Sequence, residues 1–345
     1  MKFVRRFGVA GLSAAALVFA GAGPGVAADL TVSSYGGIFE TTMRECFVAP
    51  FEKETGKSVA LVLGQPTQWV NQILATAAKP PIDVLVSNAT FTFLARDKKA
   101  LDKITQNDLP ALKDVPKEMV DMLDGYGAVM DFGILGLTYD KRRIKNPPKS
   151  FQEFIDRTIK GEWKAALPNA AYSGTPYYVI WGFADMLGGG LDNVDPAFDA
   201  IKRMKASGNL TFWTSSTDFL NQLQSGEFEI GMYFDGRTFA FMDEGADWVG
   251  FVNPAPGSVM GPTTISKVAN GSPLAWKFID IVLQPQPQAC FAEKMQYGIV
   301  NTKAQPSPKT AERLVKWNET RLPPYEKLGD YIPKWIERWN KEIGG

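Results

Sequence analysis

The sequence predicts an α/β fold divided into two domains. Strand-like segments alternate with helical ones from residue 29 onward, which is the pattern of a doubly wound sheet. The chain has 345 residues, and at about 150 residues per domain this length corresponds to two domains. A hydrophobic share of 45% and a charged share of 21% are typical of a folded chain, which argues against disorder and coiled coil.

The first third of the chain supplies three predicted strands, each followed by a predicted helix. Residues 29–34 (DLTVSS) alternate apolar and polar side chains, and residues 82–87 (IDVLVS) form an apolar run typical of a buried parallel strand. Apolar residues recur at helical spacing after each strand, and Gly56 marks the end of the first helix. The predicted elements are strands at 29–34, 59–63 and 82–87, and helices at 40–55, 69–78 and 92–99.

A glycine-rich apolar segment at residues 125–139 has only one charge, and we interpret it as an extended crossing between the domains. The pattern from Ser215 to Asp218 is typical of a capping box and predicts a helix start there. Beyond the crossing, we expect helices starting at 151 and 215 and spanning 176–187, 196–206, 274–283 and 287–296, with strands at 164–168, 228–234 and 248–253. The tryptophans of the C-terminal tail are expected to clamp it to the body: Trp317, Trp335 and Trp339.

The N-terminus has the three parts of a secretory signal peptide. The first six residues carry three cations, and residues 8–20 form an apolar run that is too short to span a bilayer. Small residues at 26–28 suit a signal peptidase, so we expect residues 1–28 to be removed and the mature chain to begin at Asp29. The sequence therefore predicts an exported protein.

The composition excludes several classes of function. Lys plus Arg and Asp plus Glu both number 37, whereas nucleic-acid-binding proteins usually carry a clear basic excess. The chain contains no histidine, which excludes a Ser-His-Asp triad, a Cys-His dyad and an HExxH zinc helix. We therefore expect neither a nucleic-acid partner nor an enzyme.

Several segments, in one consistent order, resemble periplasmic solute-binding proteins of ABC importers, in a subgroup near the spermidine/putrescine-binding proteins. The resemblance covers nearly all of the mature chain. The segments are SYGGIFE at 34–40, PFEKETGKSV at 50–59, FGILGLTYDKRRIKNPPKSFQEF at 132–154, KGEWKAALPN at 160–169, SGEFEIGMYFDGR at 225–237 and SPLAWKFIDIVLQPQPQACFAE at 272–293.

This resemblance implies a two-lobed periplasmic-binding-protein fold of type II, with two doubly wound sheets joined by a two-strand hinge. It implies a periplasmic monomer that has no cofactor, binds a small solute and docks transiently on an ABC permease of the inner membrane. The order of the segments implies an N-lobe of residues 29–132 and 258–303, a C-lobe of 137–252 and 304–345, and hinges near 131–136 and 253–257.

The chain has two cysteines, Cys46 and Cys290, which lie 244 positions apart. Export would place them in an oxidising compartment, where an even pair is a disulfide candidate. Two buried free thiols are the alternative. The implied lobes put Cys46 on the first N-lobe helix and Cys290 on a late helix that returns to the same lobe, so we expect a disulfide between them.

Candidate ligand-binding residues cluster where the predicted strands end, because ligands of open α/β sheets lie outside the carboxyl ends of the strands. Glycines let the backbone approach a ligand closely, and helix N-termini present N–H groups to polar oxygens. Aromatic faces suit methylene or cationic groups. The candidates are Tyr35, Gly36, Gly37, Ser87, Asn88, Asp131, Phe132, Ser173, Gly174, Thr175, Trp213, Ser215, Phe234, Asp235, Arg237 and Thr263.

The charges among these candidates indicate a class of solute. Polyamine binders of the family use several cleft carboxylates, but residues 169–172 (NAAY) and 258–263 (SVMGPT) contain no acid. Because an unpaired buried charge is costly, one cation and one carboxylate suit Asp131, Asp235 and Arg237 better than a long dication does. We therefore expect an amine-containing solute that is amino-acid-like, opine-like or a polyamine.

Three alternatives remain open. A ferric-iron-binding protein of the same fold would use a tyrosine pair, and Tyr177 and Tyr178 are adjacent, although successive side chains of a helix point about 100° apart. A secreted hydrolase would use a pair of carboxylates such as Asp131 and Asp235. An adhesive or structural exported protein would lack a closing cleft.

Overall fold

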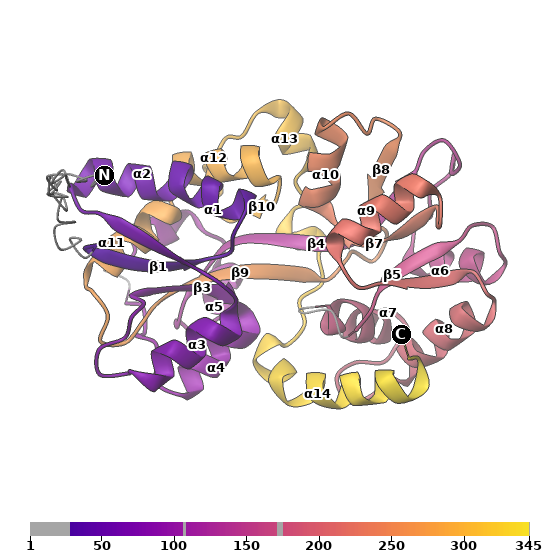
Figure 1. Ribbon diagram of the computed structural model, residues 1–345, viewed down its shortest axis with the longest axis horizontal. Helices are drawn as coiled ribbons and strands as arrows, with labels where there is room; N and C mark the ends of the chain where they lie inside the picture. The colour runs from indigo at the N-terminus through magenta and orange to yellow at the C-terminus, as the bar shows by residue number, and fades with distance from the viewer. Residues whose placement is uncertain (1–27, 106–107, 171–174, 345) are drawn as a thin grey trace, which may run out of the picture.

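A computed structural model describes residues 28–105, 108–170 and 175–344 of the chain. The predicted signal peptide, apart from its last residue, lies outside these ranges. Within them, no helix combines the length and the apolar character needed to cross a membrane. The molecule is elongated, with the first two strands of the chain at one end and the strands between residues 165 and 234 at the other (Figure 1).

Ten strands form one continuous curved sheet. Parallel neighbours β2, β1 and β3 occupy one end, and parallel neighbours β7, β5 and β6 occupy the other. The order along the sheet is β2 (Val59–Leu63), β1 (Leu30–Ser34), β3 (Val84–Asn88), β9 (Met260–Lys267), β4 (Ala128–Asp140), β7 (Ile230–Phe234), β5 (Ala165–Pro168) and β6 (Leu210–Trp213); β8 (Val249–Val252) and β10 (Gly298–Ile299) pair with β4.

Strand β4 joins the two ends of the sheet. Its residues 128–134 pair with β9, and its residues 135–140 pair with β7 and β8. The crossing predicted at 125–139 is therefore confirmed as a strand. The sequence predicted two doubly wound sheets joined by a two-strand hinge. Because β4 belongs to both ends, strand pairing runs without interruption from β2 to β6.

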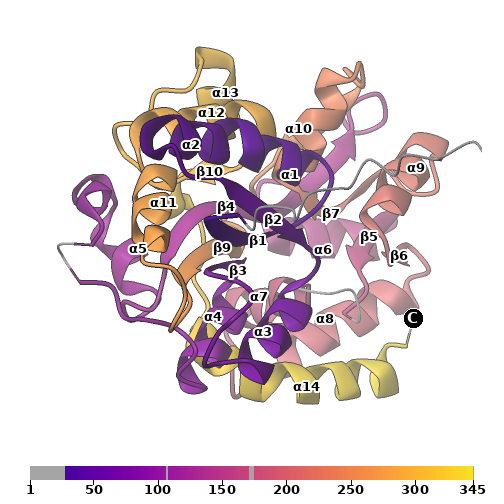
Figure 2. The same ribbon diagram turned by 60° about the vertical axis from the view of Figure 1, so that its left-hand side comes forward.

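In the first half of the sheet, helices cover both faces of β1–β3, with α1 and α2 on one face and α3 and α4 on the other (Figures 1 and 2). The single helix expected at 40–55 consists of α1 (Ile38–Met43), a π-helical stretch η1 (Arg44–Val48) and α2 (Ala49–Thr55). It ends as predicted at Gly56, whose φ is 67°. Helix α3 (Pro66–Ala75) begins three residues earlier than expected because Gln65 and Gln68 cap it. The next helix is α4 (Ala89–Asp97).

The second half of the sheet has α9 (Ser216–Ser225) and α10 (Asp235–Asp243) on one face and α7 (Gly182–Met186) and α8 (Asp195–Ala206) on the other (Figures 1 and 2). The Ser215 hydroxyl accepts a hydrogen bond from the backbone N–H of Asp218 at 3.4 Å, as the capping pattern predicts. Helix α10 and strand β6 were not expected. The remaining elements here are α6 (Phe151–Ile159) and the π-helical η3 (Tyr177–Trp181).

Late elements of the chain return to both halves. Helices α11 (Leu274–Val282) and α12 (Pro285–Met295) pack beside η1, and Cys290 of α12 forms a disulfide with Cys46, with 5.6 Å between the Cα atoms. The expected disulfide is therefore present. The smaller elements are η2 (Pro110–Asp114), α5 (Lys117–Asp121), α13 (Pro308–Arg313) and η4 (Trp317–Glu319).

The tail ends in α14 (Tyr325–Glu342), which runs along the base of the molecule (Figure 1). Trp335 and Trp339 are buried, whereas Trp317 is only partly buried. The tail was expected to belong to the C-lobe, yet α14 also packs on α4, where Glu326 pairs with Arg96 at 2.8 Å. The tail therefore touches both halves of the sheet.

Candidate functional site

A cavity of about 820 Å³ lies where the two halves of the sheet meet. The first half contributes the loop after β1, the end of β3 and residues of β9. The second half contributes η3, the end of β7 and helices α9 and α10, whose places are visible in Figure 2. Of the predicted ligand-binding residues, eight line this cavity: Tyr35, Gly36, Ser87, Asn88, Asp131, Phe234, Arg237 and Thr263.

Asp131 of β4 is the buried charge of this cavity. Its side chain is 1% exposed, and its Oδ1 atom accepts a hydrogen bond from the Thr263 hydroxyl at 2.9 Å. Its Oδ2 atom has no hydrogen-bond partner among the residues that the structure describes. Burial raises the pKa of Asp131 from 3.8 to about 7, and the Thr263 hydrogen bond offsets part of this rise. One carboxylate oxygen therefore remains available to a cationic group.

Asp235 was expected to face the solute, but the structure places it differently. It starts α10, is 1% exposed, and accepts hydrogen bonds from the backbone N–H of Ile134 (3.3 Å) and of Gly236. It is not among the residues that line the cavity. Burial raises its pKa to about 7, and the backbone hydrogen bonds offset part of this rise. Its carboxylate is thus hydrogen-bonded to backbone N–H groups at the start of α10.

Arg237, on the first turn of α10, lines the cavity and is exposed. Its guanidinium carbon lies 6.0 Å from the centroid of the Phe234 ring. No acidic side chain within the described ranges, Asp235 included, forms an ion pair with it. A planar guanidinium of this kind can bind a carboxylate through two hydrogen bonds.

Tyrosines form much of the remaining wall. Tyr177 and Tyr178 stack with their ring centroids 4.3 Å apart, and both line the cavity. Adjacent side chains of a helix leave the backbone in different directions, yet these two rings stack and both reach the cavity. Both hydroxyls converge on Gly261 of β9, where a Cβ atom would lie 1.4 Å from the Tyr178 Oη and 3.4 Å from the Tyr177 Oη. Burial raises the pKa of Tyr177 to about 12, and that of Tyr178 further.

Comparison with known proteins identifies the family of this chain. Residues 47–316 match the family model described as "Bacterial extracellular solute-binding protein". The chain belongs to this family. A γ-aminobutyric acid-binding protein of Pseudomonas aeruginosa is 26% identical to this solute-binding protein over 312 residues, which cover 84% of this chain and 82% of that one.

Solved structures of other solute-binding proteins share the fold. An extracellular solute-binding protein from Bordetella parapertussis superposes with a TM-score of 0.85 at 30% identity, covering 91% of this chain and 98% of that one. A binding protein from A. tumefaciens B6 in complex with glucopine superposes with a TM-score of 0.70 at 17% identity, covering 90% and 99%. These neighbours are of the two-lobed type, as the sequence predicts.

Six other predicted ligand-binding residues of this solute-binding protein are described by the structure and lie outside the cavity lining: Asp235, Gly37, Phe132, Thr175, Trp213 and Ser215. Trp213 is 1% exposed, and its indole N–H donates to the Met232 carbonyl at 3.0 Å, because the end of β6 faces the core. Phe132 is 1% exposed, Ser215 caps α9, Gly37 precedes α1, and the Thr175 hydroxyl donates to the Asn169 carbonyl. Ser173 and Gly174 lie outside the described residues.

Sequence reasoning missed Tyr297, which follows α12 and lines the cavity. Its ring lies against Gly236 and Gly133, where Cβ atoms would come within 2.6 and 3.1 Å of it. Burial and the nearby charges of Asp235 and Asp131 raise its pKa. The only signal in the sequence was that both positions opposite the ring are glycine.

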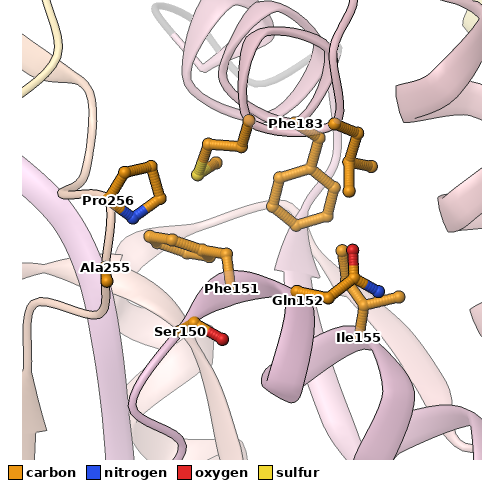
Figure 3. A pocket seen from close by; sticks show the side chains of 9 residues that line it. Ser150, Phe151, Gln152, Ile155, Phe183, Ala255 and Pro256 are labelled. Atoms are coloured by element: carbon orange, nitrogen blue, oxygen red, sulfur yellow. The ribbon is translucent and has the colours of Figure 1, made fainter.

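A second, smaller pocket of about 250 Å³ lies between α6, α7 and the turn at Ala255 and Pro256. Phe151 and Phe183 converge on it, with Pro256 at one side (Figure 3). Its lining residues carry no charge, so it offers a polar solute little to bind.

In the described part of the protein, no group of three or more acidic or cysteine side chains is placed to hold a metal ion.

Proposed function

We propose that this protein is the periplasmic binding component of an ABC importer and that its solute carries both an ammonium group and a carboxylate. Amino-acid-like and opine-like solutes have this combination. The relative from P. aeruginosa is named for γ-aminobutyric acid, and a structural neighbour holds glucopine, which supports the same class. A polyamine would leave Arg237 facing a cation.

The observation that carries this proposal is the unpartnered Oδ2 atom of Asp131. A buried carboxylate oxygen without a partner costs free energy, and an ammonium group would satisfy both its hydrogen bond and its charge. Arg237 lines the same cavity, has no acidic partner among the residues that the structure describes, and suits the other end of the solute. Tyr35, Phe234 and the tyrosine pair would pack against the chain that joins the two ends.

Transport would follow from closure of the two halves around the solute. Residues of both halves line the cavity, so a bound solute contacts both only when they are close together. Such a solute shifts the open–closed equilibrium by its difference in affinity for the two forms. We propose that the protein is a monomer with two lobes. One lobe consists of residues 29–132 and 258–303, and the other of residues 137–252 and 304–345. The lobes close on each other about hinges near 131–136 and 253–257. The closed form then docks on the permease.

Native mass spectrometry of freshly purified protein tests the solute class directly, because it weighs any solute that co-purifies. We expect a solute with one basic nitrogen and one carboxylate, and we expect Asp131→Asn to lose it. Asp280→Asn is the matched control, because Asp280 is also buried (8% exposed) but lies outside the cavity lining. A co-purified diamine without a carboxylate, retained by Asp131→Asn, would contradict the proposal.

Ferric iron is a second candidate because the Tyr177 and Tyr178 hydroxyls converge at the same cavity. Iron would require the phenolate forms, and burial raises the pKa of both hydroxyls, which disfavours those forms. Addition of ferric citrate distinguishes the candidates, since tyrosinate coordination to iron would produce a visible colour. We expect no colour change.

A further inference from the structure

The C-terminal tail packs behind the tyrosine wall of the cavity. Tyr325, the first residue of α14, is 5% exposed and is not among the residues that line the cavity. Its ring meets that of Tyr177 in a T-shaped contact, with 6.2 Å between the centroids and 81° between the planes. Tyr177 in turn stacks on Tyr178, and both of these residues line the cavity. The wall that a solute would meet is therefore backed by a side chain of the tail.

The same side chain is bonded to strand β9. The Tyr325 hydroxyl donates to the carbonyl of Met260 at 2.7 Å, and the Met260 N–H donates to the Arg321 carbonyl at 2.9 Å. The tail thus bonds to both the N–H and the carbonyl of the residue that precedes Gly261. The Tyr178 hydroxyl packs on Gly261, where a Cβ atom would lie 1.4 Å from it. Tyr325 therefore contacts both sides of the junction between the tyrosine pair and β9.

The two sides of this junction belong to different halves of the sheet. The tyrosine pair lies in η3 of the second half, whereas β9 continues to Thr263, whose hydroxyl donates to Asp131. A binding side chain holds its direction only when the residues around it lock its rotamer, and an edge-to-face contact between rings is one such lock. The position of Tyr177 relative to Asp131 therefore depends on a residue that the solute does not reach.

We infer that Tyr325 is a positioning residue of the solute site. Its ring holds Tyr177 in the stack with Tyr178, and its hydroxyl ties that stack to β9 through Met260. This inference rests on the proposed function only in taking the cavity as the solute site. Without the Tyr325 ring, a void would open behind Tyr177, and the Tyr177 ring would turn into it and away from the solute.

Isothermal titration calorimetry with γ-aminobutyrate as the probe tests this role. Tyr325→Leu removes the ring and should weaken binding about tenfold, or about 1.4 kcal/mol. Tyr325→Phe keeps the ring edge against Tyr177 and should bind within about threefold of wild type. Tyr331→Leu is the matched control, because Tyr331 lies on the same helix, packs on Trp335 with 5.9 Å between the centroids, and lies outside the cavity lining. Thermal melts establish that each variant is folded at the temperature of the titration.

A double-mutant cycle separates positioning from a general loss of stability. If Tyr325 acts through Tyr177, Tyr325→Leu should weaken binding no further in a protein that already carries Tyr177→Leu. Fully additive effects of the two substitutions would refute the inference, and so would equal losses of affinity in Tyr325→Leu and Tyr331→Leu. Tyr325→Met, which fills similar space without an aromatic edge, takes the place of Tyr325→Leu if that variant does not fold.

A crystal structure of the empty Tyr325→Leu protein adds a readout that needs no solute. We expect the Tyr177 ring to be displaced from Tyr178, and an unchanged stack would refute the inference. A wild-type protein that binds a diamine but not γ-aminobutyrate would overturn the proposed solute class. In that case the displaced or unchanged stack still decides the role of Tyr325, so the two failures are distinguishable.

Discussion

Asp131 should make the stability of the empty protein depend on pH, and Asp131→Asn should remove that contribution. The perturbation is nearly isosteric, and the asparagine side chain can still accept the hydrogen bond from Thr263 at Oδ1. It replaces an ionisable group that is 1% exposed by a neutral one. The variant therefore isolates the cost of burying the charge.

The sign follows from the direction of the pKa shift. The pKa of Asp131 rises from 3.8 to about 7 on folding, so between these values the native state binds more protons than the unfolded state. The native state is then favoured at low pH and loses that advantage as the pH rises through about 7. At pH 5, which is about two units below the native pKa, the contribution is about 3 kcal/mol, and by pH 8 it is nearly gone.

Urea unfolding of the empty protein at pH 5 and pH 8 measures this difference between wild type and Asp131→Asn. Asp235 also has a pKa of about 7, which the charge of Asp131 helps to raise, so the difference between the two pH dependences reports Asp131 together with its coupling to Asp235. We expect that difference to be about 3 kcal/mol in free energy of unfolding. If Asp131→Asn shows the same pH dependence as wild type, the carboxylate is ionised throughout, and the argument from its burial fails.

Four further outcomes are expected. Arg237→Lys should weaken binding of carboxylate-bearing solutes more than tenfold, or about 1.4 kcal/mol, without moving the unfolding curve; unchanged affinity with tight diamine binding would return the protein to the polyamine class. Denatured, unreduced protein should contain no titratable thiol, and reduction should lower the free energy of unfolding by up to about 5 kcal/mol. Gly261→Ala should weaken solute binding because its Cβ would lie 1.4 Å from the Tyr178 hydroxyl, whereas Gly190→Ala, which meets no atom within 4 Å, should bind normally. Small-angle scattering should show a smaller radius of gyration with solute than without it, and an unchanged radius would argue against closure at the two hinge segments.

Much of the fold was predictable because local patterns determine it. Alternation, apolar runs and caps identified β1, β2 and β3, and the glycine-rich apolar run at 125–139 indicated the crossing strand β4. Helix α10 was missed because Asp235 and Gly236 follow a strand and resemble a turn. The glycine is instead needed in the first helical turn to admit the ring of Tyr297, which is 61 positions away. A contact between such distant residues leaves no periodic signal in the sequence.

The site was predictable where strand ends alone determine it and unpredictable where packing across strands does. The loop after β1 and the end of β3 line the cavity as the rule for open α/β sheets requires. Trp213 and Asp235 also stand at strand ends, yet their polar atoms bond to the backbone. The Trp213 indole N–H donates to the Met232 carbonyl, and Asp235 accepts from the N–H groups of Ile134 and Gly236. For Asp235, the side of the strand end that faces solvent depends on the helix that follows, α10, which was not foreseen.

The cost of burying Asp131 links the stability of the empty protein to the selectivity of the site. Near neutral pH, an empty cavity holds either a protonated carboxyl or an unpaired charge, and both are poorer partners for Oδ2 than a cation. A cationic solute removes that penalty as it binds, whereas a neutral isostere leaves it in place. The pKa rise from 3.8 to about 7 corresponds to a cost of about 4 kcal/mol for ionising Asp131 in the empty cavity. How much of that cost a cationic solute offsets can be measured as the loss of affinity that Asp131→Asn causes for a cationic solute, compared with the loss for its neutral isostere.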